Sequence, residues 1–125
     1  MTSTECCLPL LLPVTARSIS LGQALTARSG ADAIFYNPAS LAGVGKDEFV
    51  IHHQATFEGQ DIAITVAIDA GLAGSFGLTY VLMDKGQSDA TSEGGQVTGT
   101  VAVRYHQLIA SYATPVTAGL RAGVS

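Results

Sequence analysis

The residues best able to do chemistry in this sequence are its histidines and cysteines, and their spacing does not build a site. His52 and His53 are adjacent, and consecutive side chains of a strand point to opposite faces, so the two cannot share one metal on one surface. Cys6 and Cys7 are adjacent and are the only two cysteines. A disulfide between them is disfavoured, and neither can join a second cysteine elsewhere to hold zinc. We therefore expect no metal and no cofactor.

Two glycine patterns suggest catalysis only superficially. The run Gly74-Ser75-Phe76-Gly77 is one residue shorter than the Gly-x-Ser-x-Gly elbow of a nucleophilic serine, and it lies inside a strand pattern. The glycines at 71, 74 and 77 do not have dinucleotide-binding spacing, and no helix follows them. The sequence therefore predicts a protein that is not an enzyme. Glycine inside a strand is more typical of a bulge or a bend.

Composition restricts the class of protein. Charged residues make up 13% and hydrophobic ones 47% of the 125 residues, yet no apolar run approaches the ~18–20 residues of a membrane-spanning helix. The net charge is −4 and no cluster of lysine and arginine occurs, which argues against nucleic-acid binding driven by phosphate contacts. A soluble β domain and a transmembrane β-barrel both remain open.

The first sixteen residues, 1–16, form a segment of their own. A short apolar run from Cys6 to Pro13 precedes Val14-Thr15-Ala16, which resembles the small-residue site of a signal peptide. The basic residues expected before such a run are missing, and Glu5 stands in their place. A degraded or truncated export signal and a disordered apolar tail both fit this pattern.

From about residue 48 onwards the apolar residues alternate with a period of two, which predicts five antiparallel strands. The predicted strands begin near Phe49, Ile62, Leu72, Val101 and Leu120. The predicted connections are Glu58-Gly59, Ala70-Gly71, the polar stretch Asp84–Gly99, and Pro115-Val116. Near Gln107 the alternation becomes ambiguous, which suggests a bulge.

The two faces of these strands differ in kind. One face carries branched and aromatic residues, and the other carries small and polar ones. Strands of about 9–12 residues match tilted transmembrane β-strands, whereas strands in soluble proteins average ~5–6. Short turns on one side and a longer loop on the other fit a barrel as well. The sequence thus favours an outer-membrane barrel, and the alternative is a secreted or periplasmic β-sandwich that binds a partner.

The region before the strands resembles a known family. An Arg17-x-x-x-Leu21-Gly22 opening leads, through helix-like spacing over 18–28, to a run that ends in Asn37-Pro38-Ala39. Residues 17–43 resemble the N-terminus of PorV/PorQ-type outer-membrane proteins, relatives of the long-chain fatty-acid transporter family. Ser40 stands where that group more often has glycine. The resemblance implies a barrel of about fourteen strands with a plug-like segment inside.

On this interpretation residues 17–47 are the plug-like segment and 48–125 are a partial barrel of about five strands. Because bacterial barrels begin at about eight strands, we expect the chain to be the N-terminal part of a longer protein. The resemblance implies passage or binding of hydrophobic small molecules, or partnership with secretion-system proteins. It places the protein in the outer membrane, in contact with lipid.

The resemblance also suggests roles for single residues. Asn37, Pro38 and Ala39 would fix the path of the plug, with ligand contact by Asn37 as a second option. Gly74 and Gly77 in the third strand would either form a kink that opens the wall or pack closely against the plug. If they form the kink, valine at both positions should abolish hydrophobic uptake.

Charged and polar side chains complete the expected lumen. Arg104 and Arg121 are expected to face it, either paired with Asp32 or Asp69 or simply solvated. His52 would line the lumen, and His53 would lie near the membrane interface.

Overall fold

The chain was analysed as a computed structural model, which describes residues 15–22, 24–56, 59–91 and 94–125. Three short helices come first, followed by five strands and a further single turn of helix. The helices are α1 (Ala16–Ser20), η2 (Ala31–Phe35), η3 (Pro38–Gly43) and, between two strands, η4 (Gly71–Ala73). The strands are β1 (Glu48–Thr56), β2 (Gly59–Asp69), β3 (Ser75–Thr91), β4 (Val97–Thr117) and β5 (Leu120–Val124).

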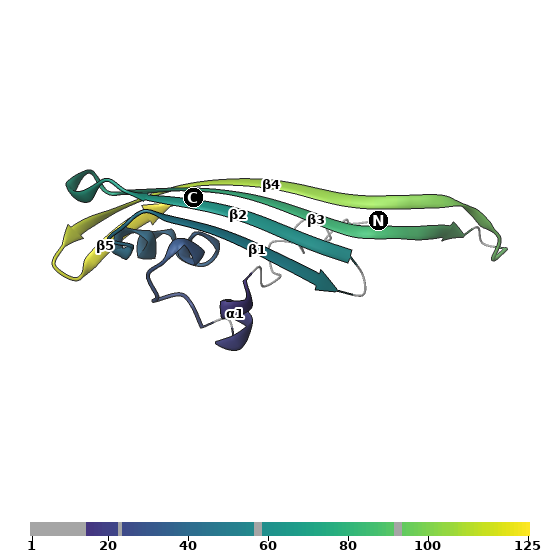
Figure 1. Cartoon of the computed structure of the whole chain (residues 1–125), viewed down its shortest axis with the longest axis horizontal. Coiled ribbons are helices and arrows are strands. Elements are labelled where there is room, and N and C mark those ends of the chain that lie inside the picture. The colour runs from purple at the N-terminus through teal and green to yellow at the C-terminus, as the bar shows by residue number, and fades with distance from the viewer. Residues whose placement is uncertain (1–14, 23, 57–58, 92–93) are drawn as a thin grey trace.

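The five strands form one antiparallel sheet in the order β1-β2-β3-β4-β5, so every strand pairs with its neighbour in sequence (Figure 1). The predicted antiparallel sheet after a short helical segment is confirmed. The sheet is open, with β1 and β5 at its edges, and is not closed into a barrel. Among the described residues, no helix combines the length and the apolar character needed to cross a membrane.

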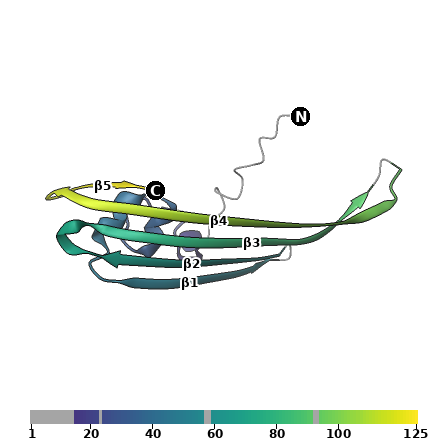
Figure 2. The ribbon, with the colours of Figure 1, turned by 90° about the horizontal axis from the view of Figure 1, so that it is seen from above.

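The helical part before β1, residues 15–47 and called here the N-terminal segment, lies against one side of the sheet (Figures 1 and 2). It is less helical than expected over 18–28, because α1 ends at Ser20 and Gly22 takes a positive φ of 57°. The predicted signal segment falls almost entirely on residues 1–14, which lie outside the described part.

Side chains on the two sides of the sheet have different environments. Ala63, Thr65 and Ala67 of β2 are buried, and the alternate residues Ile64, Val66 and Ile68 are exposed. We call the side that bears Thr65 the covered face and the side that bears Val66 the exposed face.

The polar stretch 84–99 is not the loop that the sequence predicted. β3 continues to Thr91 and β4 begins at Val97, so the two strands form a long hairpin that projects past β1 and β2 (Figure 1). The pairing shifts between Asp84 and Gln87, where Gly86 has a φ of 70°. A bulge absorbs the extra residue and the ladder resumes. Because both faces of the hairpin are accessible to water in this region, polar side chains there are compatible with continued strand pairing.

The predicted turn at Pro115-Val116 is also wrong. β4 runs to Thr117, and the chain reverses at Ala118-Gly119, where Gly119 has a φ of 100°. β3 begins opposite Ala113, so beyond that point β4 pairs with β5 alone. A strand with one free side tolerates a proline, which has no N–H to donate.

Three predictions remain: the connections at Ala70-Gly71 and Glu58-Gly59, and the bulge near Gln107. At Ala70-Gly71 the chain turns through η4, and Oδ1 of Asp69 accepts a hydrogen bond from the Gly71 amide at 3.0 Å. At Glu58-Gly59, Glu58 lies outside the described residues and Gly59 opens β2. No bulge occurs at Gln107, which pairs in regular register with Val81.

Candidate functional site

The centre of the covered face is a contact between bulky residues of the N-terminal segment and small residues of the sheet. Ile34 and Leu41 are buried against Ala67 and Ala113. A Cβ atom added to Gly77 would overlap Cδ1 of Ile34 and lie 2.9 Å from Cδ2 of Leu41. Gly77 therefore gives these two side chains the space that any larger residue would fill.

The two glycines considered as a kink have separate roles in this structure. Gly74 lies before β3, with a φ of 98°, and its carbonyl accepts a hydrogen bond from the Ala70 amide at 2.9 Å. Gly77 lies within β3, whose pairing with both neighbours is continuous from Ser75 to Asp84. Gly74 thus serves a turn, and Gly77 serves a close contact within a regularly paired stretch of β3.

Asn37, Pro38 and Ala39 form the start of η3. Oδ1 of Asn37 accepts a hydrogen bond from the Ala39 amide at 3.2 Å, and Pro38 occupies the first turn, where its missing N–H costs nothing. The Asn37 amide also donates to the Thr26 carbonyl at 2.8 Å, and the Ser40 hydroxyl donates to the same oxygen at 3.1 Å. These bonds fix the path of the N-terminal segment.

Polar contacts attach this segment to β1. A hydrogen bond of 2.9 Å joins Nε2 of His52 to Oδ1 of Asp32, and both side chains are more than four-fifths buried. The Ala31 amide donates to Oε2 of Glu48 at 2.8 Å. Because both contacts reach η2 from β1, they hold its start against that edge of the sheet.

The opposite edge of the sheet holds the segment through β5. The guanidinium of Arg121 donates to Oγ of Ser29 at 3.1 Å. A Cβ atom on Gly123 would overlap the backbone of Pro38 and Ala39, so β5 and η3 approach each other closely. Arg121 thus lies on the covered face, and its partner is a serine rather than the aspartates weighed from the sequence.

Between these edges lies a buried polar pair. Oγ1 of Thr65 and Oγ1 of Thr79 are 2.9 Å apart and share a hydrogen bond across β2 and β3, with both residues fully buried. One hydroxyl donates and the other accepts, which reduces the penalty of burying the pair. The Ser111 hydroxyl, also buried on the covered face, has no hydrogen-bond partner in the described part of the chain.

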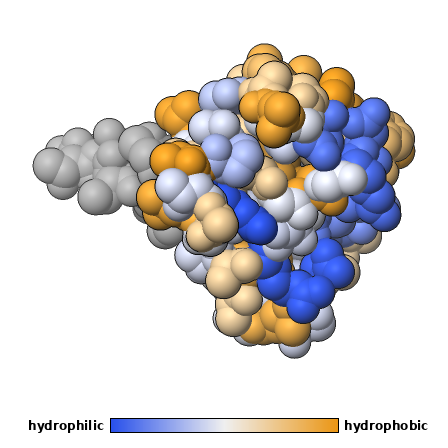
Figure 3. Space-filling model, turned by 90° about the vertical axis from the view of Figure 1, so that its left-hand side faces the viewer, coloured by the Kyte–Doolittle hydropathy of each residue, from blue (hydrophilic) through white to orange (hydrophobic). Residues whose placement is uncertain are grey.

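The exposed face carries the large apolar side chains, and the described residues place nothing over it. Phe76 and Tyr112 stack with ring centroids 5.0 Å apart, and the Tyr112 hydroxyl donates to the Ala73 carbonyl. The exposed large apolar residues that the pairings assign to this face are Phe49, Ile51, Ile64, Val66, Ile68, Phe76, Leu78, Tyr80, Leu108, Tyr112, Leu120 and Val124. We call this set the apolar belt. Figure 3 views the molecule from the η4 end, where hydrophobic and hydrophilic side chains lie in separate patches.

Arg104 does not face the N-terminal segment, as the sequence had suggested, but lies on the exposed face. It pairs directly with Asp84, and its Nε donates to Oδ2 of Asp84 at 2.9 Å. The large residues Val101, Val103 and Tyr105 had placed Arg104 on the small-residue side. Regular register from Ala113 back to Arg104 shows instead that the large residues change sides along β4.

Polar side chains lie where the apolar belt ends on β3 and β4. Asp84 lies past the last belt residue of β3, and the Gly86 amide, which donates to its Oδ1 at 2.9 Å, is the main cause that lowers the pKa of this carboxyl. Arg104 lowers the pKa of Asp84 further. Two residues nearer the belt on β4, Nδ1 of His106 lies 2.7 Å from the hydroxyl of the belt residue Tyr80.

Beyond the bulge the polarity of the two faces is reversed. Gln87 and Asp89 pair with Ala102 and Thr100, so the exposed face there is polar. On the other face lie Val101, Val103 and Tyr105, of which Val101 and Tyr105 are exposed. The projecting hairpin therefore carries Val101, Val103 and Tyr105 on the covered-face side and polar residues on the side that continues the belt.

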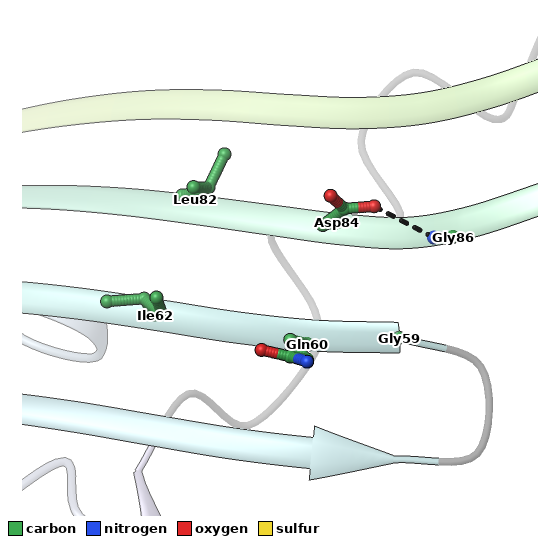
Figure 4. A pocket seen from close by; sticks show the side chains of 6 residues that line it. All are labelled: Gly59, Gln60, Ile62, Leu82, Asp84 and Gly86. Atoms are coloured by element: carbon green, nitrogen blue, oxygen red, sulfur yellow. Dashed lines mark hydrogen bonds between the residues drawn. The ribbon is translucent and has the colours of Figure 1, made fainter.

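A shallow hollow of about 320 Å³ lies at the junction of belt and polar end (Figure 4). Ile62 and Leu82 line its apolar side, and Gln60, Asp84 and the glycines at 59 and 86 line the polar side. Lys85 lies nearby and forms an ion pair with Asp61, with Nζ 3.3 Å from Oδ1. The hollow is open and lies on the exposed face of the sheet.

Among the described residues, no three histidine, cysteine, aspartate or glutamate side chains come together. His52 lies on the covered face with Asp32, and His53 lies on the exposed face. Sequence reasoning did not single out Glu48, Ser29 or Thr26. Their contacts join residues 11 to 92 positions apart, and no local pattern signals such pairs.

Comparisons with protein-family models, with curated proteins and with solved structures return no match to this chain.

Proposed function

We propose that this sheet is a segment of the wall of an outer-membrane β-barrel, with the N-terminal segment inside it. One observation carries the proposal: the covered face is built mainly of small residues, with a few larger ones such as Val81 and Met83, whereas most of the large apolar side chains of the sheet lie on the face left open. A protein that folds in water buries its largest apolar side chains. Soluble monomers rarely expose a continuous apolar surface of this kind, whereas a barrel wall turns it towards lipid.

Strand length and edges support the same proposal. The stretch of β3 from Ser75 to Asp84 pairs on both sides and has ten residues, and a tilted strand needs about 9–11 to cross a bilayer. The free edges of β1 and β5 expose backbone groups that lipid cannot satisfy. Further strands must therefore join these edges, and together they would close the barrel.

A β-sandwich would require a different arrangement. In a sandwich the inner faces of two sheets carry the large apolar residues and pack on each other. Here the N-terminal segment lies on the face with Gly77, Thr65 and Thr79. A second sheet over the apolar belt would make that belt the core, with the N-terminal segment outside.

The test of membrane residence is extraction of the native full-length protein from cell envelopes. A barrel stays with the membrane after washing with high salt and with alkaline carbonate, and it is released only by detergent. Release by either wash would overturn the barrel and support the sandwich. A known outer-membrane barrel and a peripheral envelope protein serve as controls in the same samples.

We further propose that the barrel binds or passes hydrophobic molecules. The support is the apolar surface that Val101, Val103 and Tyr105 form on the covered-face side of the projecting hairpin, where Val101 and Tyr105 are exposed. In a barrel this surface would line the entrance, where an apolar solute could leave water.

Neighbouring positions on the hairpin give a matched test. Val103→Asp places a charge on the inward face, and Ala102→Asp places the same charge on the opposite, polar face. We expect Val103→Asp to lower uptake of a hydrophobic dye several-fold in cells that carry the full-length protein, with Ala102→Asp unchanged. Equal uptake by both variants would remove the transport proposal and leave the barrel standing.

A further inference from the structure

Past Asp84, strand β3 is paired on only one of its two sides. Its ladder with β2 ends at the pair of Gln60 and Asp84, because β2 begins at Gly59. Figure 4 shows β3 continuing past Gly86, beyond the end of β2. Residues 87–91 pair with β4 alone among the described strands. We call the side of residues 87–91 that points away from β4 the free edge of β3.

The free edge differs from the edges at which a sheet is extended. The neighbours of β3 are β2 and β4, so strands added beside β1 or β5 would not pair with residues 87–91. Alternate residues of a paired strand direct their N–H and C=O groups to opposite sides. At the free edge these backbone groups are available to a further strand.

The projecting hairpin has only two strands at this level, which limits its stability. Two-stranded hairpins are marginally stable in water, and a third strand is the usual remedy. Proteins commonly block an exposed edge with proline or lysine, and residues 87–91 contain neither. The bulge at Gly86 precedes this stretch, and regular pairing resumes at Gln87. The free edge therefore lacks the common obstacles to strand addition.

Side chains beside the free edge indicate which extended segment would fit. Asp89 is exposed on the polar side of the hairpin, and a basic residue directly opposite it on an added strand would form an ion pair. Ala90 lies on the other side and pairs with Gly99. An apolar side chain opposite Ala90 would pack over these two small residues, on the side where Val101 is exposed. The edge thus favours a segment in which basic and apolar residues alternate.

We propose that the free edge of β3 binds an extended segment of another protein as an added strand. Main-chain hydrogen bonds would supply the affinity, and the alternating side chains would supply the specificity. A second copy of this chain fits less well. Antiparallel pairing of two free edges requires hairpins that point in opposite directions, whereas barrels in one membrane point the same way, and a parallel pair of identical edges is not symmetric. Only this exclusion of a second copy rests on the proposed barrel.

Peptide binding to the native full-length protein, purified in a non-ionic detergent, tests the proposal. The probe is a short fluorescent peptide in which lysine and valine alternate, and fluorescence anisotropy measures its binding. One control peptide has glutamate in place of lysine, and a second has methylated backbone nitrogens that cannot donate to a ladder. Amide hydrogen exchange then shows where on the protein the probe is bound.

We expect the lysine peptide to bind and to slow amide exchange over residues 87–91, with no change over 75–84, which are already paired on both sides. The glutamate peptide should bind more weakly, and the methylated peptide should not bind. Asp89→Asn should weaken binding of the lysine peptide about threefold, since it removes one cross-strand ion pair. Leu72→Lys makes the same change in net charge at the other end of β3 and should leave binding unchanged. Both side chains are exposed, so neither variant should disturb folding.

Several outcomes would overturn the proposal, each for a different reason. Slow exchange over residues 87–91 without any peptide would mean that another part of the full-length chain covers the edge, or a second copy if the protein is then a dimer. Equal binding of the methylated peptide would mean adsorption through side chains. No binding of the lysine peptide would exclude strand addition of this chemistry. The barrel would survive all of these results, because extraction from cell envelopes tests it separately.

Discussion

The two faces of the sheet differ in what they carry and in what touches them. On the covered face, Leu41 has none of its surface exposed, and it packs where Gly77 leaves room. On the exposed face, Leu78 directly follows Gly77 in sequence, and half of its surface is open. The difference shows that the sheet packs on its own N-terminal segment mainly through small residues, whereas most of its large apolar side chains lie on the other face. The proposed barrel accounts for this distribution.

The largest effect is expected from truncating a side chain that is buried against the covered face. Leu41→Ala removes a fully buried side chain between the N-terminal segment and the sheet, and such truncations cost about 2–5 kcal/mol. The segment should detach more often, and trypsin should cleave after Arg28 at least tenfold faster. Leu72→Ala, in the fully exposed η4 turn, is the control. Equal cleavage rates in both variants would mean that the two sides of the sheet are not distinguished by packing.

An arginine introduced on the exposed face tests whether lipid or water contacts that face. Leu78→Arg near the centre of the apolar belt should destabilise the protein in vesicles by about 2–4 kcal/mol, the cost of arginine near the bilayer mid-plane. If the belt faced water, this exposed position would tolerate arginine within about 0.5 kcal/mol. Urea unfolding in vesicles measures the change. Asp89→Arg, on the same face but outside the belt, is expected to have little effect.

A smaller effect is expected from the polar contact between Asp32 and His52. Replacing both by alanine, singly and together, should give a coupling energy of about 1 kcal/mol for this largely buried hydrogen bond. His53 is the adjacent residue on the exposed face, so His53→Ala should show no coupling to Asp32→Ala. A coupling at His53 as strong as that at His52 would contradict the assignment of the two histidines to opposite faces.

The smallest effect is expected at the polar end of the belt. The Gly86 amide and Arg104 lower the pKa of Asp84 in the folded chain, so ionised Asp84 favours folding. That contribution is present above the ordinary carboxyl pKa and is lost as the pH falls through the folded value. In Asp84→Asn the stability should depend slightly less on pH in the acid range, and the two curves should converge at the acid end. A variant curve that stays parallel to the native one would contradict this contribution.

Much of this architecture could be read from local pattern. Alternation with a period of two located the strands and divided their residues into two faces. Successive side chains of a strand point to opposite faces, so a difference between the two faces appears in the sequence as alternation. Asn37-Pro38 marked the start of η3, because an Asx side chain and a proline fix a helix start by themselves. Gly77 could be recognised as a close contact or a bend, but its neighbours Ile34 and Leu41 come from another part of the chain.

The errors arose where the large residues change from one face of a strand to the other, or where polar residues lie within a strand. Arg104 was given the wrong face because Val101, Val103 and Tyr105 are large residues on the small-residue side of β4. The stretch after Asp84 was taken for a loop because its residues are polar, although backbone pairing continues to Thr91. Pro115 suggested a turn because the sequence does not show that β3 begins only opposite Ala113.

The most direct test of the central claim is the intact mass of the native protein recovered from the outer-membrane fraction. A closed barrel built on these five strands should have a mass of about three times the 12.8 kDa of this chain, since the resemblance implies about fourteen strands and bacterial barrels have at least eight. A mass of 12.8 kDa or slightly less, found in the soluble fraction, would contradict the account. In that case the apolar belt would have to be covered by protein rather than by lipid.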